Sequence, residues 1–417
     1  MSLTHDVLIV GGGMVGGSLA LALRRSGLRV GLIEARPFPT GNAPAFDDRV
    51  IALSLGSRRI MQGLGLWEDL APEATAIRRI HVSDRGHFGA TRIDCADEGV
   101  EALGYVAELR AMGAVLTHHF ERDEAEPELI MPATLVDLEQ DADAVRVTVE
   151  RGSGERDELA ARLLVAADGT HSPVRERLGI AVQREDYGQT AVIANVATER
   201  SHDGVAYERF TEHGPLAMLP MSDGRCSLVW THRSEDAEAR MAQDDDAFRA
   251  DLQQAFGWRL GAITRVGRRA SYPLALWRSA ADYQGRCVLI GNAAHTLHPV
   301  AGQGLNLGLR DVAVLAELLW EAAHRGRDPG SAVLLARFSE WRRADLRFTA
   351  GYTDFLVRLF SNPWPPLAHA RAAGLIVVDR LPPLRHALAR RNMGLAGRQP
   401  LLGRGLSPLE RIARWAS

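Results

Sequence analysis

The chain of 417 residues contains no lysine, so all 49 of its basic residues are arginine. This absence excludes the phosphate-binding lysine of a P-loop, the strand lysine of a protein kinase and any Schiff-base lysine. Acidic residues number 52, so the formal net charge is −3 and the basic excess typical of nucleic-acid binders is missing. We therefore expect no nucleic-acid partner and no chemistry that depends on lysine.

Cysteine is scarce as well, and no long apolar run is present. Cys95, Cys226 and Cys287 lie far apart and form no CxxC or Cys/His spacing, so we expect no metal site and a reduced, cytoplasmic setting. The uncharged segment 7–23 has 17 residues and is interrupted by five glycines. It is therefore short of the roughly 20 apolar residues that a membrane span needs.

The segment that resembles a span fits a strand, a glycine turn and a helix better. Residues 6–10 form a β-branched run typical of a buried parallel strand, and residues 14–25 predict the following helix. Gly11, Gly13 and Gly16 occupy the GxGxxG positions between and within them. Glycine there permits a tight turn, close approach of the backbone to a pyrophosphate, and close packing of helix on strand.

An acidic residue stands where a dinucleotide site requires one. Glu34 follows a second predicted strand, 29–33, and a carboxylate at this distance can bind two ribose hydroxyls. It would also repel the 2′-phosphate of NADP. The pattern predicts dinucleotide binding and leaves FAD and NAD both open.

Two later segments have the same form, a buried strand followed by a loop. Asp168 and Gly169 follow one apolar run, and Ser172 and Pro173 then predict the start of a short helix. The second begins with a strand at 287–290. The chain then runs from Gly291 to Pro299, and Gly302 and Gly304 lie just before a long helix predicted from about Leu305 to Ala323. Free N–H groups at such a helix start can meet an anion or a carbonyl-rich ring.

In this order and spacing the three motifs resemble the class A flavoprotein monooxygenases, which have the para-hydroxybenzoate hydroxylase fold. The resemblance covers about residues 5–360. Within that group the chain is similar to the ubiquinone-biosynthesis hydroxylases that act on polyprenylated methoxyphenols, in residues 76–86, 191–198, 208–230 and 291–311. The wider group has Gly-Asp where this chain has Gly291-Asn292. Asparagine can still donate and accept hydrogen bonds, so this difference does not argue against FAD and instead narrows the resemblance to the ubiquinone-biosynthesis hydroxylases.

The resemblance implies FAD as cofactor and assigns residues to it. Arg49 and Arg110 are arginines for which an ion-paired surface role is the alternative. No catalytic base can be named, and the weak catalytic candidates are His295, His298 and Arg49. The cofactor-binding candidates are Gly11, Gly13, Gly16 and Glu34 at the ADP half, Arg49 near the pyrophosphate and flavin, Arg110, Asp168, Gly169, Asn292 at the ribityl or ribose hydroxyls, Pro299, which fixes the approach of the loop, and Gly302, Gly304, Leu305 and Asn306 along the isoalloxazine.

The expected fold class is α/β: a Rossmann-like FAD-binding domain with an inserted antiparallel β-sheet substrate domain and a C-terminal helical region. The predicted FAD-binding domain is discontinuous. The boundaries are 1–71, 101–180 and 280–340 for the FAD-binding domain, 72–100 and 181–279 for the substrate domain, where apolar and polar residues alternate, and 341–417 for the helical region.

The resemblance implies hydroxylation of a polyprenylphenol ring at C1, using O₂ and NADH or NADPH as transient reductant, through a flavin C4a-hydroperoxide. Hydroxylation of another ring carbon, and a flavin-bearing scaffold that works with other ubiquinone-biosynthesis proteins, both stay open. A flavin halogenase is disfavoured because its active-site lysine cannot exist here. Residues 356–378 mix apolar residues with arginine, which allows peripheral contact with the inner membrane, although a packed helix pair is the simpler interpretation.

Overall fold

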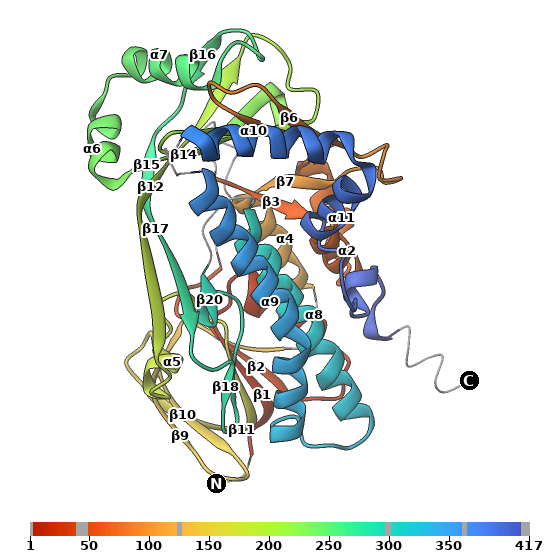
Figure 1. Cartoon of the computed structure of the whole chain (residues 1–417). Helices are drawn as coiled ribbons and strands as arrows, with labels where there is room; N and C mark the ends of the chain where they lie inside the picture. Colours follow the sequence, from red (N-terminus) through yellow and green to blue (C-terminus); the bar gives the residue numbers. More distant parts are fainter. Residues whose placement is uncertain (1–2, 39–48, 123–126, 297–301, 361–364, 410–417) are drawn as a thin grey trace.

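The computed structural model describes residues 3–38, 49–122, 127–296, 302–360 and 365–409. Two β-rich halves are joined along one side by long strands, and helices lie across the other side (Figure 1). Three sheets are present in the described part of the chain, with eight, nine and three strands.

The eight-stranded sheet has a parallel centre in the order β19-β11-β1-β2-β8. Its central strand is buried on both faces, because helices α1 (Met14–Ala22), α4 (Leu109–Glu121) and α8 (Gln303–His324) cover one face and antiparallel strands pack over the other. The strands are β1 (His5–Val10), β2 (Val30–Ile33), β8 (Glu128–Ile130), β9 (Ala133–Gln140), β10 (Val145–Arg151), β11 (Arg156–Ala166), β18 (Tyr283–Gln284) and β19 (Cys287–Leu289).

The nine-stranded sheet has the order β20-β17-β12-β15-β14-β13-β5-β6, with β16 also paired to β12. Its neighbours are antiparallel except for the parallel pair β13–β5. One face packs on helices α6 (Ser234–Ala242) and α7 (Asp245–Phe256). The strands are β5 (Arg79–Asp84), β6 (Ala90–Asp94), β12 (Val182–Thr198), β13 (Val205–Thr211), β14 (Gly214–Pro220), β15 (Arg225–Arg233), β16 (Ile263–Val266), β17 (Ala270–Ser279) and β20 (His295–Thr296).

A small sheet and the remaining helices lie between and beside these two sheets. The small sheet has the order β3-β7-β4, with β3 (Val50–Ser54), β7 (Gly104–Glu108) and β4 (Ala74–Ile77). The other helices are α2 (Leu55–Gly63), α3 (Trp67–Leu70), α5 (Pro173–Arg177), α9 (Ala332–Phe360), α10 (Pro365–Arg380) and α11 (Pro382–Asn392).

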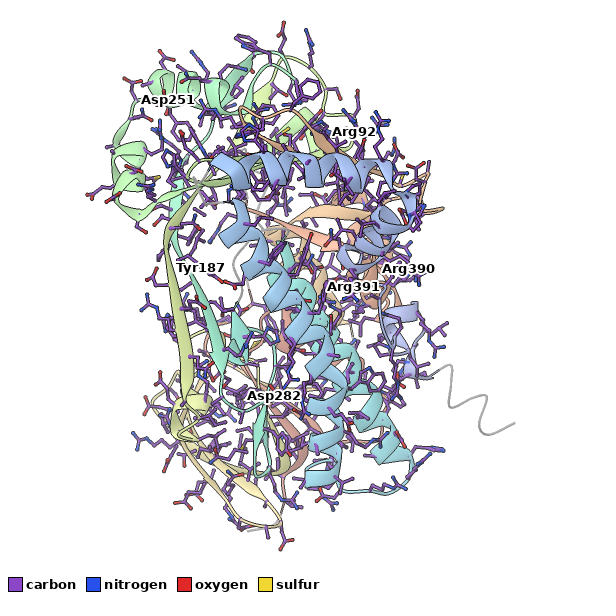
Figure 2. The ribbon with its side chains drawn as sticks, viewed as in Figure 1. Arg92, Tyr187, Asp251, Asp282, Arg390 and Arg391 are labelled. Atoms are coloured by element: carbon purple, nitrogen blue, oxygen red, sulfur yellow. The ribbon has the colours of Figure 1, made fainter. Side chains whose placement is uncertain are left out.

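The C-terminal helices are held against the rest of the molecule by polar contacts. The hydroxyl of Thr91 on β6 donates to the carbonyl of Leu375 on α10 at 2.8 Å. Beside it, the backbone N–H of Arg92, labelled in Figure 2, donates to the carboxylate of Asp379 at 2.8 Å. Tyr187 of β12, also labelled there, donates to Asp354 of α9 at 3.3 Å. None of the described helices is long and apolar enough to cross a membrane.

The predicted fold class is confirmed, and the predicted elements differ from the structure mainly at their ends. Helix α1 ends at Ala22 rather than Arg25, because Arg25 has a positive φ of 57° in the turn before β2. Helix α8 begins at Gln303, so Gly304 lies inside its first turn instead of before it. The division into domains stays a prediction. In the small sheet, β4 lies within the predicted substrate domain, whereas β3 and β7 lie within the predicted FAD-binding domain, so this sheet contains strands of both.

Candidate active site

The glycine turn after β1 leaves the start of α1 open. A Cβ atom on Gly11 would lie 2.5 Å from the carbonyl oxygen of Ala167, and one on Gly16 would lie 1.9 Å from the carbonyl oxygen of Gly11. Gly13 differs, because a Cβ atom there would meet no atom within 4 Å. Gly13 is also the N-cap of α1, and no side chain caps the first N–H groups of the helix.

Glu34, at the end of β2, lies beside this turn. Its Oε2 atom accepts from the backbone N–H of Gly12 at 2.6 Å, and its Oε1 atom accepts from the N–H of Arg36 at 2.9 Å. Each carboxylate oxygen keeps a lone pair for a further donor. The turn therefore fixes the orientation of the acid that sequence spacing predicts for the ribose hydroxyls.

Asp168 meets the same turn from β11. A Cβ atom on Gly11 would lie 3.0 Å from the Cα atom of Asp168. The Oδ2 atom of Asp168 accepts from the N–H of Val174 at 3.1 Å, while its buried Oδ1 atom has no hydrogen-bond partner among the described residues. Burial raises the pKa of this carboxyl. Gly169 follows with φ of +88°, and Ser172 caps α5 as predicted, accepting from the N–H of Arg175.

The loop of the third motif is locked by one buried carboxylate. Asp311 of α8 accepts from the N–H of Gly291 at 2.9 Å and bonds Nε2 of His295 at 2.8 Å, and its other oxygen accepts from Nε of Arg342 at 2.6 Å. Burial alone would raise the pKa of Asp311, but Arg342 and His295 outweigh it and hold that pKa well below its ordinary value. Within this loop Asn292 is exposed, and Nδ1 of His295 is buried without a partner among the described residues.

The start of α8 is fixed to β3 by Asn306. The amide oxygen of Asn306 accepts from the N–H of Ser54 at 2.8 Å, and its amide nitrogen donates to the carbonyls of Ala52 and Gly302 at 2.9 and 2.6 Å. All of these contacts are to the chain itself, so Asn306 supports the helix start structurally. Gly302 is the N-cap with φ of 60°, and a Cβ atom on Gly304 would meet nothing within 4 Å.

The two candidate arginines have protein partners. Arg49 is exposed, and its guanidinium donates to the hydroxyl of Tyr272 at 2.8 Å. Arg110 pairs with Glu108 at 2.9 Å and with Glu73 at 3.3 Å, which is the ion-paired arrangement that the alternative interpretation expects. His298 and Pro299 lie outside the described residues. Leu305 lies in the first turn of α8 and is half-buried.

A cavity of about 630 Å³ lies beside the start of α8. It is bounded by β3, by the face of the nine-stranded sheet opposite α6 and α7, and by helices α9, α10 and α11. Most of its lining is aliphatic or aromatic. On the side of β3 and the start of α8, the cavity is bordered by Ala52, Leu53, Ser54, Gly302, Gln303 and Asn306.

One acidic side chain on the wall of this cavity was not among the predicted site residues. Glu208 of β13 lines the cavity, and its Oε1 atom is buried without a hydrogen-bond partner among the described residues. Burial raises the pKa of Glu208 to about 7. A sequence signal exists, because Glu208 has the same strand parity as the apolar Ala206 and Phe210 and so interrupts an otherwise apolar face.

Solved structures share this architecture. The crystal structure of p-nitrophenol 4-monooxygenase from Pseudomonas putida matches with a TM-score of 0.78 and 22% sequence identity, covering 96% of this chain and all of that one. The chain thus has the fold of an FAD-dependent aromatic hydroxylase. A family model described as an FAD binding domain matches residues 4–346, and the chain belongs to this family of flavoprotein monooxygenases.

Curated relatives cover nearly the whole chain. The ubiquinone hydroxylase UbiL of Rhodospirillum rubrum is 42% identical over 409 residues, which is 96% of this chain and 93% of the relative. The 3-demethoxyubiquinol 3-hydroxylase of Escherichia coli is 33% identical over 398 residues, 94% and 98% of the two chains. Both names describe hydroxylation in ubiquinone chemistry.

FAD is the cofactor of this family, and the geometry of the chain fits it. The space at Gly13 and the open start of α1 suit a pyrophosphate, Glu34 stands at the end of β2, and Oδ1 of Asp168 still needs a donor. The individual assignments of residues to atoms of the cofactor remain predictions. The structure brings the three motifs together. A Cβ atom on Gly291, in the third motif, would lie 3.1 Å from Val15 of α1, and one on Gly11, in the first, would lie 3.0 Å from Asp168 in the second.

Proposed function

We propose that this monooxygenase hydroxylates the ring of a polyprenylated methoxyphenol at C1 in ubiquinone biosynthesis, with NAD(P)H and O₂ as co-substrates. The observation that carries the proposal is the apolar cavity of about 630 Å³ beside the start of α8. Its volume falls within the range of small-molecule sites, and its lining suits an aromatic ring bearing an isoprenoid chain. The names of the relatives support the pathway.

The residues of the three motifs would hold FAD at the edge of this cavity. When bound and reduced by NAD(P)H, FAD would activate O₂, so that an electron-rich ring can accept one of its oxygen atoms. The chain's part is to bind and orient the phenol and to exclude water from the reaction. The aliphatic wall of the cavity excludes water, because Ile77, Ile80 and Leu103 border the cavity near β3.

The isoprenoid tail would lie along the helical wall. Helix α10 lines the cavity with Gly374, Leu375 and Val378. The same helix exposes Ile376 and Val377 to solvent, at 40% and 47% of the full surface of each residue. We propose that this face touches the membrane that dissolves the substrate, so that the tail can pass from lipid to cavity along α10.

Co-sedimentation with lipid vesicles tests the membrane contact. Val377→Asp should reduce the bound fraction, whereas Val333→Asp, at an exposed apolar position on α9, should leave it unchanged. Equal binding of the two variants and the parent chain would remove this part of the proposal.

The reaction is tested by the quinone lipids of a strain that lacks the gene, measured by mass spectrometry with and without complementation. Accumulation of a polyprenyl methoxyphenol and loss of ubiquinone supports C1 hydroxylation. Accumulation of a different precursor moves the reaction to another ring carbon, the alternative that the 3-hydroxylase relative favours. Normal ubiquinone, together with no NAD(P)H-dependent product from purified enzyme and prenylphenols, would refute the proposal.

A further inference from the structure

A row of paired residues crosses the sheet wall of the cavity. Glu208 of β13 is paired with Val82 of β5 and with Ala217 of β14, and Ala217 is paired with Val229 of β15. Paired residues on neighbouring strands project from the same face. All four residues line the cavity, so the carboxyl of Glu208 is set among three aliphatic side chains.

Along its own strand Glu208 is equally isolated. Ala206 and Phe210, two residues away on either side, also line the cavity. Glu208 is the only carboxylic acid among the described residues that border this space. Burying a carboxyl without a partner is costly, and proteins retain such groups mostly where the chemistry uses them.

The other titratable groups on the wall do not neutralise Glu208. Arg371 of α10 bonds Asp84 at 3.3 Å. Burial raises the pKa of Tyr352 on α9 to about 12, to which the charge of Glu208 also contributes, and burial raises the pKa of Tyr207. Both tyrosines therefore stay neutral near neutral pH, and the raised pKa of Glu208, about 7, has burial as its cause.

We propose that the carboxylate of Glu208 accepts the phenol hydroxyl of the substrate and acts as the base that makes its ring electron-rich, an inference that rests on the proposed function. The step is a proton transfer and needs no co-reactant. The phenol O–H bond breaks, a carboxyl O–H bond forms, and the negative charge passes from Glu208 to the ring oxygen. The charge on that oxygen raises the electron density at the ring carbons that accept oxygen.

The pH dependence follows from the ionised form being the active one. A base works best when its pKa lies near the working pH, and a group with a pKa of about 7 is half ionised there. The kcat/KM for hydroxylation should therefore rise with pH through about 7 and level off above it. Tyr207 and Tyr352 lose their protons well above this range, because burial raises the pKa of each from its ordinary value of about 10.

The test compares Glu208→Gln with the wild-type holoenzyme and with Glu212→Gln. Glutamine keeps the size of the side chain and a hydrogen-bond acceptor, but it cannot take the proton. Glu212 lies in the turn after β13, outside the cavity, and serves as the matched control. FAD content and melting temperature are measured first, so that a misfolded variant is recognised. Glu208→Asp, which restores a carboxylate, should recover part of the lost rate.

We expect kcat for product formation to fall by about 100-fold or more in Glu208→Gln, with the dissociation constant of the prenylphenol changed far less. The rise of kcat/KM with pH through about 7, which reports the free enzyme, should disappear in this variant and persist in Glu212→Gln. A Glu208→Gln enzyme with wild-type kcat and pH profile would overturn the inference and leave the proposed function standing. A wild-type enzyme that gives no hydroxylated phenol would instead overturn the function.

A spectroscopic measurement decides the contact without turnover. The infrared difference between wild-type and Glu208→Gln holoenzyme isolates the carboxyl band, which should titrate with a midpoint near pH 7. A hydrogen bond from a phenol favours the ionised carboxylate, so adding a polyprenylphenol should move this midpoint to lower pH. A band that does not respond to the phenol would overturn the role of Glu208 whatever the activity shows.

Discussion

Replacing Asp311 by asparagine tests whether one buried carboxylate holds the third motif in place. Asp311 is 2% exposed and joins Gly291, His295 and Arg342, which belong to the loop after β19, to β20 and to α9. Asparagine keeps the shape but loses the charge, and leaves the buried guanidinium of Arg342 with Asp345 as its remaining acidic partner. Breaking a buried ion pair from one side costs about 3–5 kcal/mol.

This cost can be converted to a melting temperature. Unfolding entropy is about 2.1 cal/mol/K per residue, or roughly 0.9 kcal/mol/K for a chain of 417 residues, so the variant should melt about 3–6 °C lower. Because the pKa of Asp311 is depressed in the folded protein, its stabilisation is present above the ordinary carboxyl pKa of about 4 and declines as the pH falls below it. The difference between variant and parent should therefore shrink in acid.

The assay is differential scanning fluorimetry of the holoenzyme at several pH values, with flavin fluorescence to follow FAD release. Glu150→Gln is the control, because Glu150 and Arg156 form an exposed pair worth little. The reasoning is refuted if Asp311→Asn melts within 1 °C of the parent, retains FAD equally and shows no pH dependence of the difference.

Three further predictions follow from the site. Gly13→Val should give a folded protein without FAD, because its side chain would enter space that no protein atom occupies within 4 Å; a yellow protein with normal flavin content would contradict this. Asn292→Leu should weaken FAD by about 1 kcal/mol, the low end for a lost hydrogen bond because Asn292 is exposed, and titration of the apoprotein measures it. Burial raises the pKa of Cys226 and of Cys287 to about 12, so in native protein at pH 8 both should resist a thiol reagent that modifies Cys95.

The glycine turn, Glu34 and the capped start of α5 were predictable because each depends on residues close in sequence. GxGxxG limits the backbone directly, and Ser172 needs only the N–H three residues later. The end of α1 was predicted too late, since an arginine in the left-handed region gives no compositional warning. Helix ends are set by such local turns and by packing, which sequence patterns record poorly.

The cavity and its acid were beyond such reasoning. The cavity wall forms only because β13 lies parallel to β5, which pairs residues 205–210 with residues 79–84. Helices α9, α10 and α11 close the other side of the cavity. The acid network at Asp311 likewise joins residues from three elements. Glu208 stood in a segment quoted for its family resemblance, yet only the pairing with Val82 and Ala217 shows that it faces an apolar space.

A chain without lysine must neutralise its buried acids with arginine or histidine, and it does so consistently around this site. Asp84, Glu108 and Asp311 are each less than a tenth exposed, and each is paired with an arginine: Arg371, Arg225 and Arg342. These pairs fix β5, β7 and α8 against their neighbours. Glu208 lacks such a pair among the described residues. Burial without such a pair raises the pKa of Glu208 to about 7, and Glu208 borders the cavity that we propose for the phenol.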